Sequence, residues 1–465
     1  MSMAHQIKKA IKNNSKINLP IKALFKSKAY NDFSKLLYEC EKWSKEEVDA
    51  WQLKMVAEMV DYAFIHVPIY REKYSSIGYE SGGIRTWQDF ERLPYVTKEE
   101  IKSRYNDFCS DEKDLIKHHV GFTGGSTGKA MQMLLDVDTS EREKAAFVYY
   151  WKKYGYKYGD KCIILKDQVI EETGRLYCHD SFQNYKSLSS MYVSNKSMLE
   201  QYSKEIESFG AKTIQAFPSS LYSLARNYLS SNAVPPKFGS IFLASEEIIP
   251  QQNDVIKNVF HPDYLAYHYG HTECATLAFK HPGSENSMGL VPVYGYTELV
   301  DNGNPIKSVN TVGEIVATGR NKSMPFIRYR TGDYTSYSEY TSSDWTKNYK
   351  SINLIEGRKQ DYIVTKQDTL LAVVVMPNQY LKILDLVSEY QIEQFEKGKI
   401  VLKCVSFPNE SISENTINLI KSKYEELLGD LIDIDVQVVT EVKKSDRGKR
   451  IAMIQHLDTD IFRNR

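Results

Sequence analysis

Short apolar segments separated by helical patterns are the feature that most constrains the fold of this chain. Four of them lie in the middle of the sequence, and each has the length of a buried strand: residues 162–165, 213–216, 240–244 and 265–269. Residues 219–229, between the second and the third, have a helical pattern. Strands that alternate with helices indicate an α/β domain with a mostly parallel sheet.

The sequence changes character twice toward its C-terminus. Three short strands with turn residues between them predict a β-rich subdomain at residues 293–300, 313–318 and 326–330. Beyond residue 358 we expect a small α+β domain of about a hundred residues. Its strands are predicted at 363–365, 371–376, 390–395, 399–407 and finally 432–442, and its helices at 380–387 and 413–428. The predicted domains are therefore residues 1–357 and 358–465. Residues 45–75 are expected to be helical, with a break at Pro68.

Composition excludes several classes of protein. The 465 residues include 60 basic and 60 acidic side chains, so nothing in the charge balance requires a nucleic-acid partner. The six cysteines form no Cys-x-x-Cys pair, which indicates reduced thiols in a cytoplasmic protein. No apolar run approaches the roughly 20 residues of a membrane span, and we expect no signal peptide.

The first 30 residues combine seven lysines with isoleucine, leucine and phenylalanine. This pattern is typical of a segment that rests weakly on an anionic membrane surface. A solvated N-terminal helix or tail is the more common form of this composition, because many surface helices share it.

The glycine-rich run at residues 121–129, Gly-Phe-Thr-Gly-Gly-Ser-Thr-Gly-Lys, is the strongest local signal. Successive N–H groups in such a loop can surround phosphate oxygens, and hydroxyls and a lysine add donors and charge. The run is not a Walker A loop, because Thr123 and Ala130 stand where that motif needs glycine and serine or threonine. A glycine-rich surface turn is the alternative. The predicted phosphate-binding residues are Thr123, Gly124, Gly125, Ser126, Thr127, Gly128 and Lys129.

Four further motifs follow this loop along the chain. They are Tyr-Gly-His-Thr-Glu at 269–273, Tyr-Arg-Thr-Gly-Asp at 329–333, Gly-Arg at 357–358 and Arg-Gly-Lys at 447–449. In this order the five motifs resemble those of the adenylate-forming superfamily, which includes acyl-CoA synthetases. The ending of the loop resembles the phenylacetate–coenzyme A ligase branch, and within it the CapK-like proteins of capsular polysaccharide synthesis. The resemblance covers nearly the whole chain.

The resemblance implies a role for each motif. Glu273, beside Thr272, would bind Mg²⁺ near the phosphates of ATP. Asp333 would accept hydrogen bonds from the ribose, and Arg358 would contact ribose or phosphate. Lys449 would reach the substrate carboxylate and the α-phosphate. Other nucleotide-binding positions implied in this way are Ser245, Glu246, His268, Tyr269 and Gly270.

The implied enzyme activates a small carboxylic acid as an acyl-AMP with release of pyrophosphate, and then passes the acyl group to coenzyme A or another acceptor. The family's small C-terminal domain rotates between two poses, and its active site lies at the domain junction. An amide-forming ligase that modifies a sugar is the close alternative, and a non-catalytic scaffold is a third. Candidate residues lining the acid site are Tyr149, Trp151, Phe217, Tyr267 and His271.

The chain departs from the family pattern at two places. Gln360 stands where the hinge usually has aspartate or lysine, and residues 365–370 lack the glycine that lets pantetheine approach the backbone. These differences predict an amine acceptor in preference to coenzyme A. Cys274, His271 and His281 do not have the spacing of a zinc site.

Overall fold

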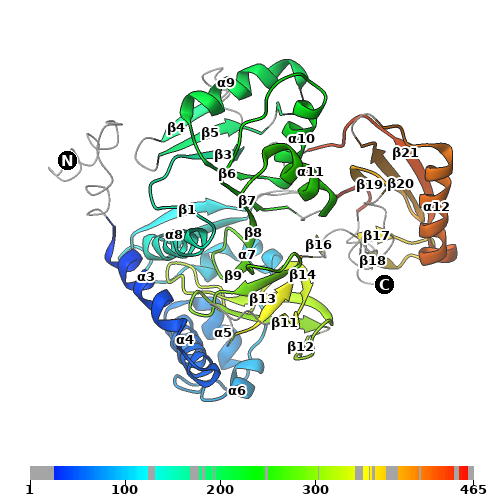
Figure 1. Cartoon of the computed structure of the whole chain (residues 1–465). Coiled ribbons are helices and arrows are strands. Elements are labelled where there is room, and N and C mark those ends of the chain that lie inside the picture. Colours follow the sequence, from blue (N-terminus) through cyan, green and yellow to red (C-terminus); the bar gives the residue numbers. More distant parts are fainter. Residues whose placement is uncertain are drawn as a thin grey trace. The chain divides into compact units, whose positions relative to one another are not determined.

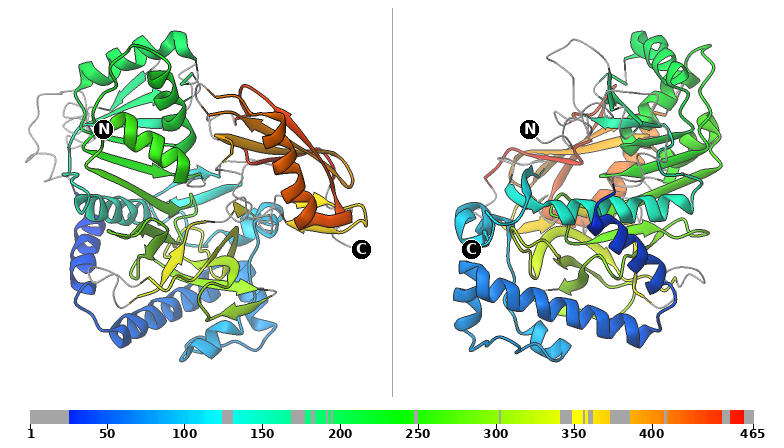
Figure 2. Two further views of the ribbon diagram at one scale, coloured as in Figure 1. Left: turned by 45° about the vertical axis from the view of Figure 1, so that its right-hand side comes forward. Right: turned by 90° about the vertical axis from the view of Figure 1, so that its left-hand side faces the viewer.

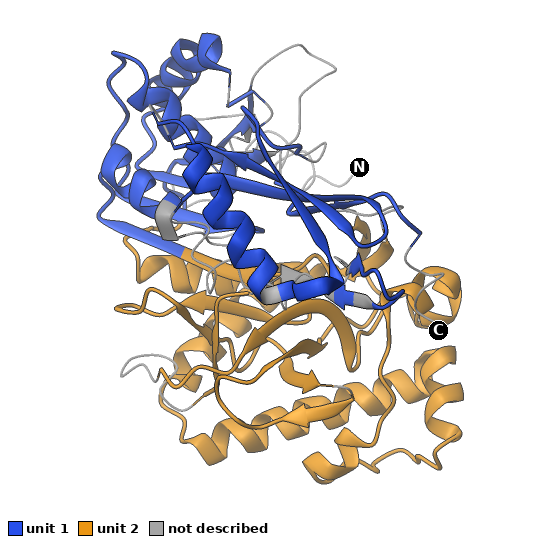
Figure 3. Ribbon diagram, turned by 90° about the vertical axis from the view of Figure 1, so that its right-hand side faces the viewer, with its two compact units in different colours: residues 1–17, 159–266, 356–465 blue, residues 18–158, 267–355 orange. Residues whose placement is uncertain are grey.

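The computed structural model describes residues 26–123, 131–167, 177–180, 184–190, 192–193, 195–246, 250–301, 303–340, 349–355, 357–358, 362–372, 386–407, 410–444 and 450–458. The chain divides into two compact units (Figure 3). Unit 1 comprises residues 1–17, 159–266 and 356–465, and unit 2 comprises residues 18–158 and 267–355.

A mostly parallel sheet forms the centre of residues 159–266 in unit 1, with strand order β7-β6-β3-β5-β4 (Figure 1). Its strands are β3 (Cys162–Asp167), β4 (Tyr177–Asp180), β5 (Tyr185–Ser189), β6 (Thr213–Ala216) and β7 (Ser240–Ala244). Strand β3 pairs in parallel with β5 and β6, β6 pairs in parallel with β7, and only β4 runs antiparallel to its neighbour. Every residue of β6 and β7 is buried, including the polar side chains of Thr213, Gln215 and Ser240. The predicted α/β fold class is confirmed.

Helices connect these strands, as the sequence predicts. After the 3-10 turn η3 (Lys196–Met198) come α9 (Leu199–Phe209), α10 (Pro218–Leu229) and α11 (Pro250–Phe260). Pro218 is the first residue of α10, where its missing N–H costs no helical hydrogen bond. Strand β8 (Tyr264–Gly270) follows α11 and continues into unit 2.

The C-terminal part of unit 1 has a hydrophobic core of its own, built from residues between Ile363 and Met453. Its four-stranded sheet has the order β21-β20-β19-β22, and α12 packs on β21 (Figure 1). The elements are β16 (Gly357–Arg358), β17 (Tyr362–Val364), β18 (Leu370–Ala372), β19 (Glu389–Glu396), β20 (Lys399–Val405), α12 (Glu414–Leu428), η6 (Gly429–Leu431), β21 (Asp433–Val438) and β22 (Met453–Gln455).

Of two predictions for this region, one is corrected by the structure and one lies mostly outside the described residues. The strand predicted at 432–442 is not the final one, because β22 follows it and pairs in parallel with β19. The helix predicted at 380–387 lies mostly outside the described residues. The domain boundary expected after residue 357 stays a prediction.

Helices dominate the N-terminal part of unit 2. They are α3 (Lys28–Cys40), α4 (Lys45–His66), α5 (Pro68–Ser75), α6 (Trp87–Glu91), α7 (Lys98–Ser103), η1 (Tyr105–Phe108) and α8 (Val137–Lys152). Helix α4 begins with a capping box in which Ser44 and Glu47 bond each other's backbone N–H groups, and Pro68 starts a new helix where the break is predicted. Helix α3 packs against α8 (Figure 2). None of the helices in the described ranges is long and apolar enough to cross a membrane. The basic segment at residues 1–25 is outside those ranges.

Antiparallel strands complete unit 2. Strands β1 (His118–Phe122) and β2 (Gln132–Asp136) form a hairpin, and β8, β9 (Leu277–Lys280), β10 (Ser287–Leu290) and β15 (Ser351–Asn353) pair in that order. A further sheet joins β12 (Asn304–Ile306), β11 (Tyr296–Asp301), β13 (Val312–Thr318) and β14 (Tyr329–Ser336). The strand predicted at 326–330 begins only at Tyr329, because Arg328 has a φ of 49° and cannot continue a strand.

Candidate active site

Two motifs that are about 60 residues apart in sequence are joined by a reciprocal pair of hydrogen bonds in unit 2. The Tyr269 hydroxyl donates to Asp333 Oδ2 at 2.8 Å, and the Tyr329 hydroxyl donates to Glu273 Oε1 at 2.8 Å. The tyrosine of each motif thus holds the carboxylate of the other. We call these four side chains the tyrosine–carboxylate pairs. All four are buried, so each hydrogen bond is shielded from water.

Glu273 lies in the turn that follows β8. Burial alone raises the pKa of its carboxyl. The nearby His271 imidazole, whose Nδ1 lies 3.1 Å from Oε2, and the Tyr329 hydroxyl outweigh this effect and lower the pKa to about 2. Glu273 is therefore a carboxylate at neutral pH. Gly270 comes just before the turn. Its backbone packs closely against the Leu277 side chain, because a Cβ at this position would lie 2.9 Å from Leu277 Cδ1. Thr272, at the tip of the turn, is exposed.

Asp333 is placed by a tight bend within β14. Gly332 has a φ of 77°, which favours glycine, and its N–H donates to Glu314 Oε1 at 3.2 Å. The Asp333 N–H donates to Thr331 Oγ1 at 3.1 Å. The bend presents the Asp333 carboxylate to Tyr269.

Only one end of the predicted phosphate loop belongs to the described residues. Thr123 is buried, its N–H donates to the Met131 carbonyl at 3.0 Å, and its Oγ1 accepts from the Met131 N–H at 2.9 Å. These two bonds close the base of the loop at the end of the β1–β2 hairpin. The predicted phosphate ligands from Gly124 to Lys129 lie outside the described residues, as do Gln360 and Lys449. Of Arg358 only the backbone, in β16, is described.

The aromatic candidates for the acid site occupy different surroundings within unit 2. The Tyr149 ring contacts Tyr38 of α3, with centroids 4.8 Å apart. The Tyr267 hydroxyl donates to the Glu285 carbonyl. The centroid of the His268 ring lies 6.5 Å from that of Trp151 and 4.7 Å from that of Phe147.

Phe147 is therefore a candidate lining residue that sequence reasoning missed. It lies one helical turn before Trp151 on α8, and that spacing was the available signal. The roles of these aromatic side chains stay predictions.

In unit 1, the structure describes three of the predicted site residues. Phe217 is buried and precedes α10. Ser245 is exposed at the end of β7 with a φ of 70°. The Glu246 carboxylate accepts from the Ser219 N–H and from the Ser219 hydroxyl, each at 3.0 Å. Glu246 thereby caps the first turn of α10, for which Phe217 offers no side-chain hydrogen bond.

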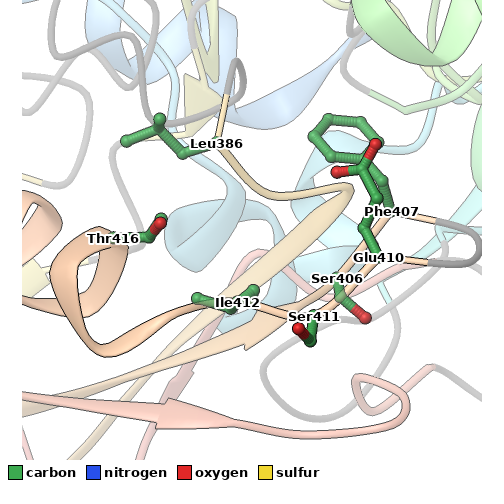
Figure 4. Close-up of a pocket in the computed structure, with 7 residues that line it drawn as sticks. All are labelled: Leu386, Ser406, Phe407, Glu410, Ser411, Ile412 and Thr416. Atoms are coloured by element: carbon green, nitrogen blue, oxygen red, sulfur yellow. The ribbon is translucent and has the colours of Figure 1, made fainter.

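A cavity of about 410 Å³ opens in the C-terminal part of unit 1 (Figure 4). Its lining residues are Leu386, Ser406, Phe407, Glu410, Ser411, Ile412 and Thr416. None of them belongs to a predicted motif.

The described part of the chain contains no group of three or more His, Cys, Asp and Glu side chains arranged to hold a metal ion. Burial raises the pKa of the Cys274 thiol well above its usual value, and its Sγ lies 3.6 Å from Glu143 Oε2.

The fold has relatives among solved structures. A 2-hydroxyisobutyryl-CoA ligase in the postadenylation state, in complex with 2-HIB-AMP, matches with a TM-score of 0.66 and 17% sequence identity, over 89% of this chain and 90% of that one. An open conformation of the same ligase, in complex with 2-HIB-AMP and CoA, matches with a TM-score of 0.58.

The fold is that of the adenylate-forming ligases.

Sequence comparison agrees with this adenylate-forming fold. The chain is 22% identical to the protein CapK of Staphylococcus aureus over 385 residues, which cover 81% of this chain and 82% of CapK. It is 24% identical to the phenylacetate–coenzyme A ligase of Thermus thermophilus over 390 residues, covering 78% and 81% of the two chains. No protein-family model matches the sequence. The resemblance to the phenylacetate–coenzyme A ligase branch of the superfamily is confirmed.

The loop between β17 and β18 is the segment in which the sequence lacks the glycine expected from the family resemblance. Asp368 there has a φ of 61°, a conformation that glycine adopts readily and other residues seldom do. The backbone thus keeps a shape suited to glycine while carrying a side chain. Lys397 Nζ pairs with Asp368 Oδ1 at 2.7 Å and holds that side chain in place.

Proposed function

We propose that this chain is an AMP-forming carboxylate ligase. A carboxylate oxygen of the acid attacks the α-phosphorus of ATP, the bond to pyrophosphate breaks, and acyl-AMP forms. A thiol or amine then attacks the acyl carbon, loses its proton, and AMP leaves. The observation that carries this proposal is the tyrosine–carboxylate pairs, because they fix two carboxyl groups within motifs that the superfamily uses for nucleotide and metal.

Each described carboxylate has a task suited to its chemistry. The Asp333 carboxylate is an acceptor for the two ribose hydroxyls, and Tyr269 orients it. Thr123 closes the loop that would surround the phosphates. Lys449 and Arg358 would add positive charge where negative charge develops in the transition state.

The donor set at Glu273 fits Mg²⁺. This ion is commonly bound in proteins by one or two carboxylates together with substrate phosphates and water, and Glu273 supplies one carboxylate that is ionised at neutral pH. When bound, Mg²⁺ would neutralise charge on the phosphate oxygens. The Tyr329 hydroxyl and His271 hold the carboxylate in position for it.

A panel of carboxylic acids, assayed for pyrophosphate release from ATP without any acceptor, tests this proposal. We expect release with at least one acid and none without acid. Silence with every acid in the panel would favour the scaffold alternative.

An amide-forming ligase is the second candidate, and the β17–β18 loop favours it. A pantetheine arm needs close approach to the backbone, and the Asp368 side chain, held by Lys397, occupies space there that glycine leaves open. An amine acceptor needs no such tunnel.

The acceptor is tested by offering preformed acyl-AMP to coenzyme A and candidate aminosugars together. Amide should dominate. A dominant thioester would identify an acyl-CoA ligase and reject the amine.

We place the enzyme in the cytoplasm, where ATP is available and thiols stay reduced. We further propose a role in polysaccharide synthesis on the ground of the sequence resemblance to CapK-like proteins, and the basic residues 1–25 would then bring the enzyme near a membrane-bound pathway.

A further inference from the structure

A second cavity, of about 430 Å³, lies in unit 2 where α3 packs against α8 (Figure 1). Its walls include Phe33 and Leu36 of α3, Arg142 of α8, and Arg320, which comes shortly after β13. None of its lining residues belongs to a predicted motif, so the cavity is separate from the tyrosine–carboxylate pairs. Its volume is within the range of roughly 300–1,000 Å³ that is usual for small-molecule sites.

Two arginines bring their positive charges together in this cavity. Arg142 Nη2 donates to the Arg320 carbonyl at 3.0 Å and to Thr139 Oγ1 at 2.7 Å, and Arg320 Nη1 donates to the Val293 carbonyl at 3.2 Å. Within the described ranges of the chain, the Nε and the second Nη of each guanidinium make no hydrogen bond. Because a guanidinium has five N–H donors, both arginines keep donors for a ligand.

Carboxylates near the two guanidiniums compensate their charge only in part. Asp136 Oδ1 lies 3.7 Å from Arg142 Nη2, and the same carboxylate already accepts two backbone N–H groups. Burial, followed by repulsion from Arg142, lowers the pKa of Arg320 to about 10, although Glu58 and Asp136 act in the opposite direction. Two like charges that are held together in a partly buried place favour the binding of an anion.

The rest of the cavity narrows the chemical class of that anion. Lys28, Asp32 and Asp138 are exposed at its rim, where solvent and salt screen their mixed charges. The Arg142 side chain is only 16% exposed, so the guanidiniums determine the charge inside. Guanidiniums bind the oxygens of phosphates in pairs. A phosphate monoester carries roughly 1.5 to 2 negative charges at pH 7, which two arginines match.

We propose that this cavity binds a small phosphate monoester, with Arg142 and Arg320 on the phosphate group and Phe33 and Leu36 against the organic group. The site takes no part in the proposed ligase chemistry and does not depend on it. A carboxylate presents a similar pair of oxygens with a smaller charge, and the experiments below distinguish the two.

Calorimetry of the full-length protein with phenyl phosphate tests the site. Arg320→Gln should weaken binding by tenfold or more, because it removes a charge-assisted contact. Asp32→Asn removes an exposed negative charge at the rim and should tighten binding about twofold. Arg92→Gln, which changes an exposed arginine after α6, is the matched control and should leave the affinity unchanged. Unchanged affinity in Arg320→Gln would overturn the site, and if that variant does not fold, unchanged affinity in Asp32→Asn would do so.

Displacement of bound phenyl phosphate tests the class of ligand. Benzoate has the same ring with a single charge, and inorganic phosphate has the charge without the ring. Each should bind at least fivefold more weakly than phenyl phosphate. Equal binding of benzoate would overturn the assignment to phosphate, and equal binding of inorganic phosphate would overturn the assignment to a monoester.

Amide hydrogen exchange locates the bound ligand. Saturating phenyl phosphate should slow exchange of the peptide 28–37 in α3 by threefold or more in the full-length protein. Slowing elsewhere with unchanged exchange in this peptide would place the ligand at another site and overturn the proposal. None of these measurements uses pyrophosphate release, so a failure of the proposed function leaves their outcome distinct.

Discussion

The hydroxyls of Tyr269 and Tyr329 hold the two carboxylates of the candidate site. Each tyrosine begins a short motif, and each bonds the carboxylate that ends the other motif. An ionised carboxylate in a buried place needs such donors, because an unpaired charge there is costly. Losing one hydroxyl should therefore disturb one half of the site selectively.

Tyr269→Phe should raise the KM for ATP by about tenfold and change the rate at saturation little, since loss of one hydrogen bond to a charged group costs roughly 1.5–3 kcal/mol. Pyrophosphate release at varied ATP concentration measures this. Tyr334→Phe, on the same strand β14, is the control and should leave the KM unchanged. An unaltered KM in Tyr269→Phe would show that the bond to Asp333 does not serve nucleotide binding.

Glu273 also makes a prediction about pH. Its folded-state pKa is about 2, below the value of roughly 4.3 for an unfolded chain. The folded state then binds fewer protons, so the stabilisation is present above about pH 5 and is lost as the pH falls from there toward 2. The two-unit difference corresponds to about 3 kcal/mol. Chemical denaturation of Glu273→Gln should show the full deficit at pH 7 and about half of it near pH 3. The same deficit at both pH values would contradict the assignment.

At the scale of elements, Arg328 fixes where β14 begins. Its guanidinium bonds both oxygens of Glu298, at 3.1 and 2.8 Å, and donates to the Glu91 and Leu93 carbonyls at 2.6 Å. These bonds tie β11 and the chain after α6 to the residue that precedes Tyr329. The start of the strand is therefore set by contacts across the sequence.

Arg328→Met should lower the free energy of unfolding by about 3–5 kcal/mol, because it leaves Glu298 buried without its partner. Denaturant titration measures the loss. Lys307→Met removes an exposed ion pair to Glu91 and should cost at most about 1 kcal/mol. Equal effects of the two substitutions would show that the buried pair is not special.

How far the sequence predicts these elements depends on where their determinants lie. Residues 240–244 carry their strand signal locally, because four of the five residues are apolar and all five are buried. Residues 213–216 carry it less clearly, because Thr213 and Gln215 are polar although they are buried. Strand β22 is short, and its position follows from its pairing with β19. Its own sequence therefore carries no local strand signal. The motifs are visible through resemblance, whereas the pairing of Tyr269 with Asp333 joins residues that only the folded chain brings together.

The whole chain combines an α/β sheet, the tyrosine–carboxylate pairs in unit 2 and a C-terminal segment with its own core in unit 1. An enzyme of this kind works mainly by positioning and electrostatics. We therefore expect Lys449 to matter more for the reaction rate than for binding of ATP.

Lys449→Ala should slow acyl-AMP formation by roughly a hundredfold or more, as loss of a transition-state contact does, while calorimetry finds ATP binding intact. Lys421→Ala, which removes an exposed lysine of α12, serves as the charge-matched control. Near-normal adenylation in Lys449→Ala would show that the lysine takes no part in the reaction.

Identifying the products formed from ATP by mass spectrometry tests most directly whether the enzyme forms acyl-AMP. The enzyme is mixed with ATP, Mg²⁺ and the acid selected by the panel, and no acceptor is added. The account predicts acyl-AMP and pyrophosphate in equal amounts, with no ADP. Formation of ADP and phosphate, or an acid-dependent reaction without any acyl-AMP, would contradict it.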